Sequence, residues 1–170
     1  PQVRSAVRAA RVVLLASRER HDVDWVPLGN PFQYRGVWVR DGARAAQALA
    51  ISGYTAESRE LARGLLRLQT PLGTFVSQTG QLDGTGQVLW ALEQTMLRPS
   101  PAVGLRRIAP RVERALRGLE LQRAESRGRP GSVAGMLPVT DPHDDELVRA
   151  QRVGNDAWAL VGYRAAERIV

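Results

Sequence analysis

The sequence contains no cysteine and only two histidines, His21 and His143. Without cysteine the chain forms neither a disulfide framework nor a cysteine metal site, and the redox state of its compartment cannot be inferred. Two histidines so far apart do not predict a zinc site, although Asp141, His143 and Asp145 together offer ligands for a divalent cation. We expect no metal and no cofactor, and the localisation is left open.

Lysine and long apolar runs are also missing. No apolar stretch approaches the roughly 20 residues that span a bilayer, and residues 1–10 lack the apolar core of a signal peptide, so we expect a soluble chain without a membrane partner. All 24 basic residues are arginines, and the net charge is +7. The arginines alternate with acidic residues, as in 57–60 and 111–114, whereas a nucleic-acid-binding face gathers them on one stripe. We therefore expect no nucleic-acid partner.

The chain has 170 residues, of which 44% are hydrophobic, enough to build the core of one domain. Apolar residues recur every three or four positions in six stretches, which predicts six helices. They are 3–17, 42–52, a stretch opening at Thr55, one around 88–96, one around 108–119, and one from about Arg152 onward. The first would bury Val3, Val7, Ala10 and Leu14, and the last Val153, Ala157, Leu160, Val161 and Ala165.

The connections between these helices are alternately short and long. Residues 21–34 hold prolines, glycine and asparagine and predict a long loop, followed by a short extended piece at 34–39. Residues 135–149 predict an irregular acidic loop. Alternating loop lengths favour helical hairpins that present their long loops on one rim, so we expect an all-α fold built as a toroid of hairpins.

The strongest local signal is the segment Trp38-Val39-Arg40-Asp41, preceded by Tyr34, where the extended piece turns into a helix. Trp38 offers a stacking face, Arg40 a planar fork of donors and Asp41 a carboxylate acceptor. Sugars need this combination, because their C–H faces lie on aromatic rings and their vicinal hydroxyls take paired hydrogen bonds. The structural alternative makes Asp41 the N-cap of the helix, Arg40 its salt partner and Trp38 a core residue.

A second constellation lies in the acidic loop, where Asp141, Asp144, Asp145 and Glu146 fall within six residues. Like charges this close repel one another, and a carboxyl crowded in this way holds its proton to higher pH, which suits a general acid. The alternative is a solvated acidic loop that caps the helix after it.

The segment 38–41 resembles the Trp-x-Arg-Asp motif of glucoamylases and related six-hairpin glycosidases, whose Arg and Asp bind the hydroxyls of the sugar at the cleavage point. Residues 42–57 and 81–92 are also similar to that family. The resemblance implies that Trp38, Arg40 and Asp41 belong to the sugar subsite. Asp83 is either a second sugar ligand or a helix cap.

In the resembling family the general acid lies in the long loop before the sixth helix. Glucoamylases carry a Trp-Glu-Glu run there, whereas this chain has Asp144, Asp145 and Glu146 without a tryptophan, so the choice among the three stays open. Inverting glycosidases also need a second carboxylate about 6.5–9.5 Å away that activates water. The family holds this base on a late helix. Residues 1–170 would then be one partial domain, about the first six of the twelve helices of an (α/α)6 barrel.

Three functions follow from these patterns. The leading one is an inverting hydrolase of α-glucosidic bonds that acts on an oligo- or polysaccharide and lacks its general base in this chain. The second is a carbohydrate-binding or scaffold module without turnover. The third is another toroid enzyme, such as a sugar epimerase or lyase, which requires a His or Tyr near Arg40. Both ends look cut, so we expect an exposed apolar flank that packs on the rest of the barrel or on a second copy.

Overall fold

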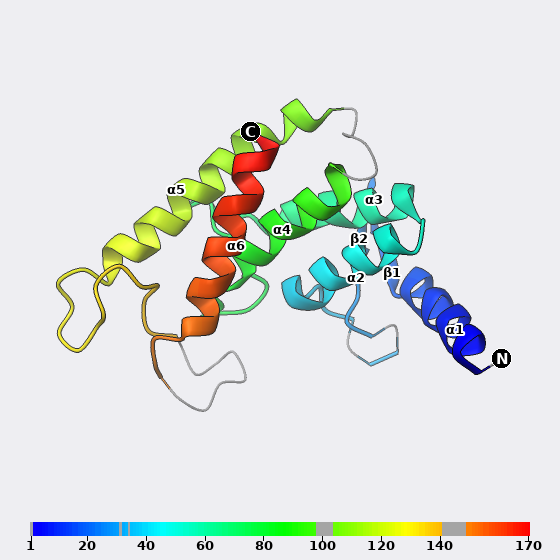
Figure 1. The fold of residues 1–170 in the computed structure, drawn as a ribbon, viewed down its shortest axis with the longest axis horizontal. Coiled ribbons are helices and arrows are strands. Elements are labelled where there is room, and N and C mark those ends of the chain that lie inside the picture. The colour runs from blue at the N-terminus through cyan, green and yellow to red at the C-terminus, as the bar shows by residue number, and fades with distance from the viewer. Residues whose placement is uncertain (1, 31, 34, 98–103, 141–148) are drawn as a thin grey trace.

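The computed structural model describes residues 2–30, 32–33, 35–97, 104–140 and 149–170 (Figure 1). These residues are mainly helical, as the sequence predicts, and none of their helices is long and apolar enough to cross a membrane. The elements are α1 Gln2–Ala16, β1 Arg18–His21, β2 Asp24–Pro27, α2 Val39–Ile51, α3 Thr55–Leu65, α4 Gly84–Met96, α5 Ala109–Glu125 and α6 Val153–Ile169, with single 3-10 turns at Leu66–Leu68 and Leu105–Arg107.

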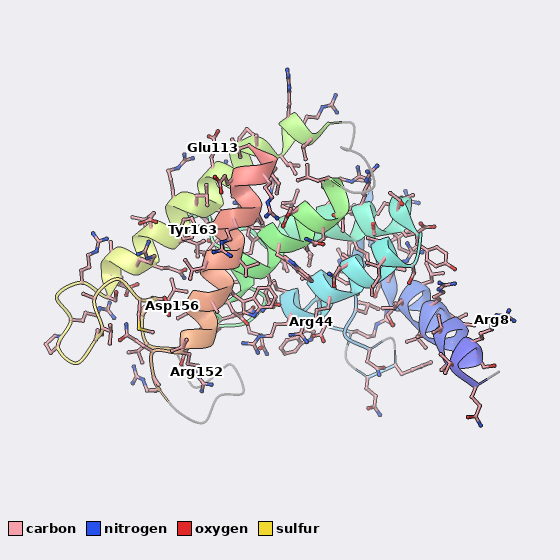
Figure 2. The ribbon with its side chains drawn as sticks, in the orientation of Figure 1. Arg8, Arg44, Glu113, Arg152, Asp156 and Tyr163 are labelled. Carbon is pink, nitrogen blue, oxygen red and sulfur yellow. The ribbon has the colours of Figure 1, made fainter. Side chains whose placement is uncertain are left out.

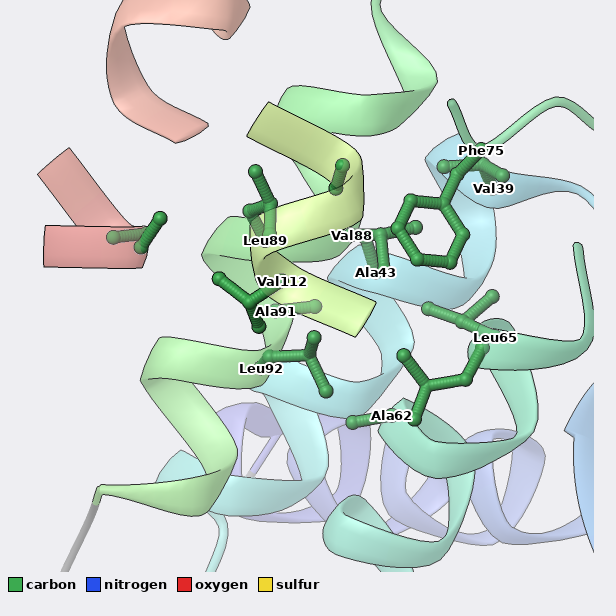
Figure 3. Packing of buried hydrophobic residues seen from close by; sticks show 14 of the residues in the cluster. Val39, Ala43, Ala62, Leu65, Phe75, Val88, Leu89, Ala91, Leu92 and Val112 are labelled. Atoms are coloured by element: carbon green, nitrogen blue, oxygen red, sulfur yellow. The ribbon is translucent and has the colours of Figure 1, made fainter. Parts of the chain in front are cut away.

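Helix α4 lies at the centre of the molecule, with α6 on one side and α2 and α3 on the other (Figure 1). Its sequence, GTGQVLWALEQTM, is apolar on most of its circumference, and almost all of its residues are buried. Phe75, which precedes it, is 1% exposed and joins the same core. Figure 3 shows this cluster, whose labelled side chains are Val39, Ala43, Ala62, Leu65, Phe75, Val88, Leu89, Ala91, Leu92 and Val112.

The crossing of α4 and α6 depends on two glycines. A Cβ on Gly86 would lie 2.0 Å from the Trp158 carbonyl oxygen, and one on Gly162 would lie 2.8 Å from the Gly86 Cα. The backbones therefore touch at this crossing, and no side chain fits between them. This contact positions the second turn of α6 beside the first turn of α4.

The inward face that the sequence predicts for α6 is wrong at three positions. Val153, Ala157 and Leu160 are exposed, and the buried face instead consists of small residues and their neighbours, namely Asn155, Ala159, Gly162, Ala165, Ala166 and Ile169. The glycine crossing explains this difference, because only a helix face made of small residues approaches the α4 backbone so closely. Larger apolar side chains are left on the outside.

The predicted loop at 21–34 is wrong in its first part, because β1 and β2 form an antiparallel hairpin. Asp22 makes the tight turn with a φ of 56°, a conformation that aspartate adopts more readily than most residues. The hairpin then packs on α3, where Gly64 lets the Trp25 carbonyl oxygen approach to 2.1 Å from where a Cβ would stand. The sequence RERH of β1 carries no apolar alternation, so periodicity did not predict the strand.

Helix α1 forms as predicted, but its expected buried stripe is not buried. Val3 is 77% exposed and Val7 46% exposed. Only the last turn reaches the core, where Leu14 and Leu15 are half-buried against it. The helix projects from the body of the molecule, so its N-terminal turns have no described element to pack on (Figure 1).

Candidate functional site

The N-terminal end of α2 borders a hollow of about 530 Å³. Its described lining comes from the segment before α2, the first two turns of that helix and the loop before α4. The lining residues are Gly29, Asn30, Trp38, Arg40, Asp41, Arg44 and Gln78. The three residues of the Trp-x-Arg-Asp segment that the sequence singles out thus lie around one space.

The prediction that Asp41 caps this helix is wrong. Helix α2 begins at Val39, with Trp38 in extended conformation at the cap position and no side chain capping the first turn. Asp41 therefore lies inside the first turn, where an acidic side chain interacts favourably with the helix dipole. It is exposed, and its carboxylate makes no hydrogen bond or ion pair with another described residue. The carboxylate is thereby available to the hollow.

Arg40 pairs with Asp83 and not with Asp41. Its Nε donates to Asp83 Oδ2 at 2.8 Å, and Asp83 is only 6% exposed. Gln87 Nε2 donates to the same oxygen at 2.6 Å, and Gln81 Nε2 donates to Oδ1 at 3.1 Å. All three partners are donors, as an ionised carboxylate requires. Both oxygens of Asp83 are thus occupied, which makes this residue a support for Arg40 and not a free ligand.

The hydrogen bonds around Asp83 continue to the start of α2. Gln81 Oε1 accepts from the Ser77 hydroxyl at 2.8 Å and from the Ser77 backbone N–H at 3.0 Å. Ser77 Oγ in turn accepts from the Val39 backbone N–H at 3.0 Å. Since Val39 and Arg40 are adjacent, the path Val39–Ser77–Gln81–Asp83–Arg40 is a closed ring. It ties the first turn of α2 to the cap position of α4.

A second hollow of about 450 Å³ shares Arg40 with the first. Its described lining comes from the N-terminal ends of three helices: Arg40 from α2, Asp83 from α4, and Arg152, Val153, Gly154, Asn155 and Trp158 from α6. The N-terminal ends of α2, α4 and α6 therefore converge here. Figure 2 shows Arg44, which lines the first hollow, and Arg152, which lines the second, well apart from each other.

Several of these residues are not among those that the sequence predicts for the site. Arg44 could have been predicted from the sequence, because it follows Arg40 by four positions and the helical period puts both residues on one face. Gln87 follows Asp83 by four positions in the same way. Trp158 and Asn155 carry no local signal, since their place depends on the glycine crossing of α4 with α6.

Four of the predicted site residues, Tyr34, Asp144, Asp145 and Glu146, lie outside the described residues. So does the potential cation ligand set Asp141, His143 and Asp145. Within the described part of the chain, no group of three or more His, Asp or Glu side chains gathers as a metal site would require. Neither hollow is lined by a described His or Tyr.

A separate polar group lies between α5 and α6, around a hollow of about 470 Å³. The Tyr163 hydroxyl donates to Glu120 Oε1, and Arg123 Nη1 donates to the same oxygen at 3.2 Å. Burial, together with the hydrogen bond to Glu120, raises the pKa of Tyr163 to about 12, and the bond from Tyr163 lowers the pKa of Glu120. Asp156 accepts from the Leu137 backbone N–H at 2.9 Å, and Figure 2 places it with Tyr163 along α6.

No protein-family model, curated protein or solved structure matches this chain.

Proposed function

We propose that this chain is the sugar-binding part of an inverting α-glucosidic hydrolase of the glucoamylase-like type. One observation carries the proposal: Trp38, Arg40 and Asp41 line a single hollow of about 530 Å³. That volume lies within the range of roughly 300–1,000 Å³ that small-ligand sites occupy. A sugar seated there meets an aromatic ring, a guanidinium and a carboxylate at once.

Each lining group has a role in this proposal. The Trp38 indole packs on the C–H face of the ring, and Arg40 and Asp41 hold hydroxyls through charge-assisted hydrogen bonds, which are stronger than neutral ones. The buried carboxylate of Asp83 keeps the Arg40 guanidinium in one orientation, so little side-chain entropy is lost when the sugar binds. Arg44 and Gln78 add further donors around the same space.

The proposed fold is about half of an (α/α)6 toroid. The convergence of the N-terminal ends of α2, α4 and α6 on one hollow supports it, because a toroid of hairpins directs alternate helices at a common centre. The general acid would be one of Asp144, Asp145 and Glu146, in the segment that leads to α6. The general base would come from later helices of the barrel.

A second candidate is a sugar-binding module without turnover. The observation that favours it is the scarcity of free carboxylates around the site. Of the described residues that line the two hollows, only Asp41 and Asp83 are acidic, and both oxygens of Asp83 already accept hydrogen bonds. An inverting mechanism needs two carboxyl groups that are free to act.

Binding of D-glucose to the whole chain, measured by isothermal titration calorimetry, tests the proposal. Asp41→Asn should weaken the affinity about tenfold or more, because a hydrogen bond to a charged group contributes roughly 1.5–3 kcal/mol. Glu57→Gln is the matched control, since Glu57 is likewise an acidic residue in the first turn of a helix, α3, and lines neither hollow. Equal affinities of the two variants, or no binding by the unaltered chain, would overturn the proposal.

Turnover distinguishes the two candidates once binding is established. Because the proposed general base lies outside this chain, a protein extended by the later helices is mixed with an α-linked glucoside, and the released sugar is followed by nuclear magnetic resonance. Release of the β-anomer supports the inverting hydrolase. Tight binding with no release, in a protein extended by the later helices, supports the binding module.

A further inference from the structure

The hollow between α5 and α6 is separate from the two hollows that Arg40 lines. Its described lining consists of Glu120 and Arg123 from the C-terminal half of α5, Gly135 from the connecting segment, and Asp156, Ala159, Leu160 and Tyr163 from α6. These residues line neither hollow at Arg40. At about 470 Å³ this space is also of the size that small-ligand sites occupy, roughly 300–1,000 Å³. The proposed sugar site does not account for it.

The lining of this hollow changes in character along α6. Its four α6 residues are Asp156, Ala159, Leu160 and Tyr163. Their spacing of i, i+3, i+4 and i+7 puts them on one stripe of the helix, about 10 Å long at a rise of 1.5 Å per residue. A carboxylate lies at one end of the stripe and a phenol ring at the other, with two apolar side chains between them (Figure 2). A ligand with one polar end and an apolar body matches this order.

The Asp156 carboxylate has an acceptor that the fold does not use. Its Oδ1 accepts from the Leu137 backbone N–H at 2.9 Å, whereas its Oδ2 is buried and accepts no hydrogen bond from a described residue. Asp156 also forms no ion pair with the described part of the chain. A buried carboxylate oxygen without a donor costs free energy. A donor that a ligand brings into the hollow would remove this cost.

The charges around the hollow favour a cation as the ligand. The Tyr163 hydroxyl and the Arg123 guanidinium both donate to Glu120 Oε1, so Glu120 already has its partners. Arg123 is held in turn by the Gly135 carbonyl oxygen, which accepts from its Nε at 2.9 Å. The charges of Glu120 and Arg123 offset each other, and Asp156 is left as the uncompensated charge of the described lining. A ligand with one positive charge would neutralise it.

We propose that this hollow binds a primary ammonium ion with an apolar body, of the arylalkylamine type. The ammonium group donates to Asp156 Oδ2, and the apolar body lies on Ala159, Leu160 and the Tyr163 ring. A charged N–H donor suits the site because the carboxylate offers both a vacant acceptor and a negative charge, and hydrogen bonds between charged groups are the stronger ones. This site is independent of the proposed sugar site, because the two share no described lining residue.

Two probes of nearly the same shape test whether the ligand must be a cation. Phenethylamine carries an ammonium group at neutral pH, and phenethyl alcohol carries a hydroxyl at the same position. Each is titrated into the whole isotope-labelled chain, and the shifts of the backbone amide signals in nuclear magnetic resonance spectra give its Kd. The amine should bind about tenfold or more tightly than the alcohol. Equal affinities for the two probes, or no shifts with the amine, would overturn the proposal.

Asp156→Asn tests the residue that is proposed to hold the ammonium group. The amide keeps an oxygen that can accept from the Leu137 backbone N–H, but it removes the negative charge. The affinity for phenethylamine should fall about tenfold or more, to that for phenethyl alcohol, and the affinity for the alcohol should stay the same.

Glu167→Gln is the matched control for this variant. Glu167 is an exposed carboxylate on the same helix and does not line the hollow, so its substitution should leave the preference for the amine intact. The Tm of both variants is recorded to show that they fold. An Asp156→Asn variant that still prefers the amine, or a Glu167→Gln variant that loses this preference equally, would refute the site at Asp156.

Discussion

Arg40 and Asp83 stand 43 positions apart in the chain, yet the Arg40 Nε lies 2.8 Å from Asp83 Oδ2. The pair joins the first turn of α2 to the cap position of α4. Arg40 lines both hollows, and Asp83 lines the second. Asp83 is buried and Arg40 is partly exposed, with side-chain exposures of 9% and 38%. A buried carboxylate thus anchors a guanidinium that reaches the surface of the hollows.

Asp83→Asn should weaken both folding and sugar binding. The amide is similar in shape, but its NH2 group would face one of three donors, so at least one hydrogen bond is lost inside the protein. We expect the free energy of unfolding to fall by about 1–3 kcal/mol in urea titrations. Glucose affinity should fall as well, although Asp83 itself does not line the first hollow. A variant that loses stability but keeps its glucose Kd would show that the pair does not orient Arg40 for binding.

The same substitution at two glycines should have opposite effects. Gly86→Ala puts a Cβ 2.0 Å from a backbone oxygen of α6, so the helices must separate, and overpacking of this kind costs about 1–3 kcal/mol. Gly154→Ala meets nothing within 4 Å and should leave stability unchanged or raise it by up to about 1 kcal/mol. Both are measured by chemical unfolding. A Gly86→Ala variant as stable as Gly154→Ala would contradict the contact between α4 and α6.

The sequence predicted the helices well because their signals are local. The apolar period and the start at Thr55 put α3 where the structure has it, and α6 begins one residue after the expected Arg152. The hairpin of β1 and β2 was not predicted. Helix α3 packs against β2, and β1 lies outside on the protein surface, where a strand needs no apolar alternation. The burial of α6 was mispredicted, because close backbone contact selects small residues over large ones.

The sequence predicted only the part of the site that one short segment contributes. Trp38, Arg40 and Asp41 are near neighbours, so a local motif indicated that they act together. Asp83, the partner of Arg40, is 43 positions away, and no period or spacing in the sequence relates the two residues. The second hollow depends on the packing of α6 against α4, which follows from Gly86 and cannot be inferred from the residues around Trp158.

The outward face of α6 should promote association. Val153 is 75% exposed and Leu160 64% exposed, and their spacing of seven places them on one side of the helix. Exposed apolar residues grouped in this way tend to pack on another surface. Leu160→Gln should lower the average mass in sedimentation equilibrium at high protein concentration. Val23→Gln, at the exposed tip of the hairpin, is the control and should change nothing. Equal masses for all three proteins would count against this face as the contact.

Tyr163 should make the protein sensitive to alkaline pH. Its pKa is raised to about 12, mainly by burial and then by its hydrogen bond to Glu120, whereas an unfolded tyrosine titrates near 10. The folded state therefore favours the neutral phenol. That contribution is complete below pH 10 and is lost as the pH rises through 12. Tyr163→Phe removes the group, so its Tm should fall less steeply between pH 10 and 12 than that of the unaltered chain.

The ultraviolet titration of the phenols gives an independent measurement of the same group. The difference in phenolate absorbance between the unaltered chain and Tyr163→Phe isolates the titration of Tyr163. Its midpoint should lie near pH 12, because the phenol is partly buried and its proton is held by the Glu120 carboxylate. Glu120→Gln removes the negative partner and should move the midpoint downward. A midpoint near 10 in the unaltered chain would show that the Tyr163–Glu120 contact does not persist in solution.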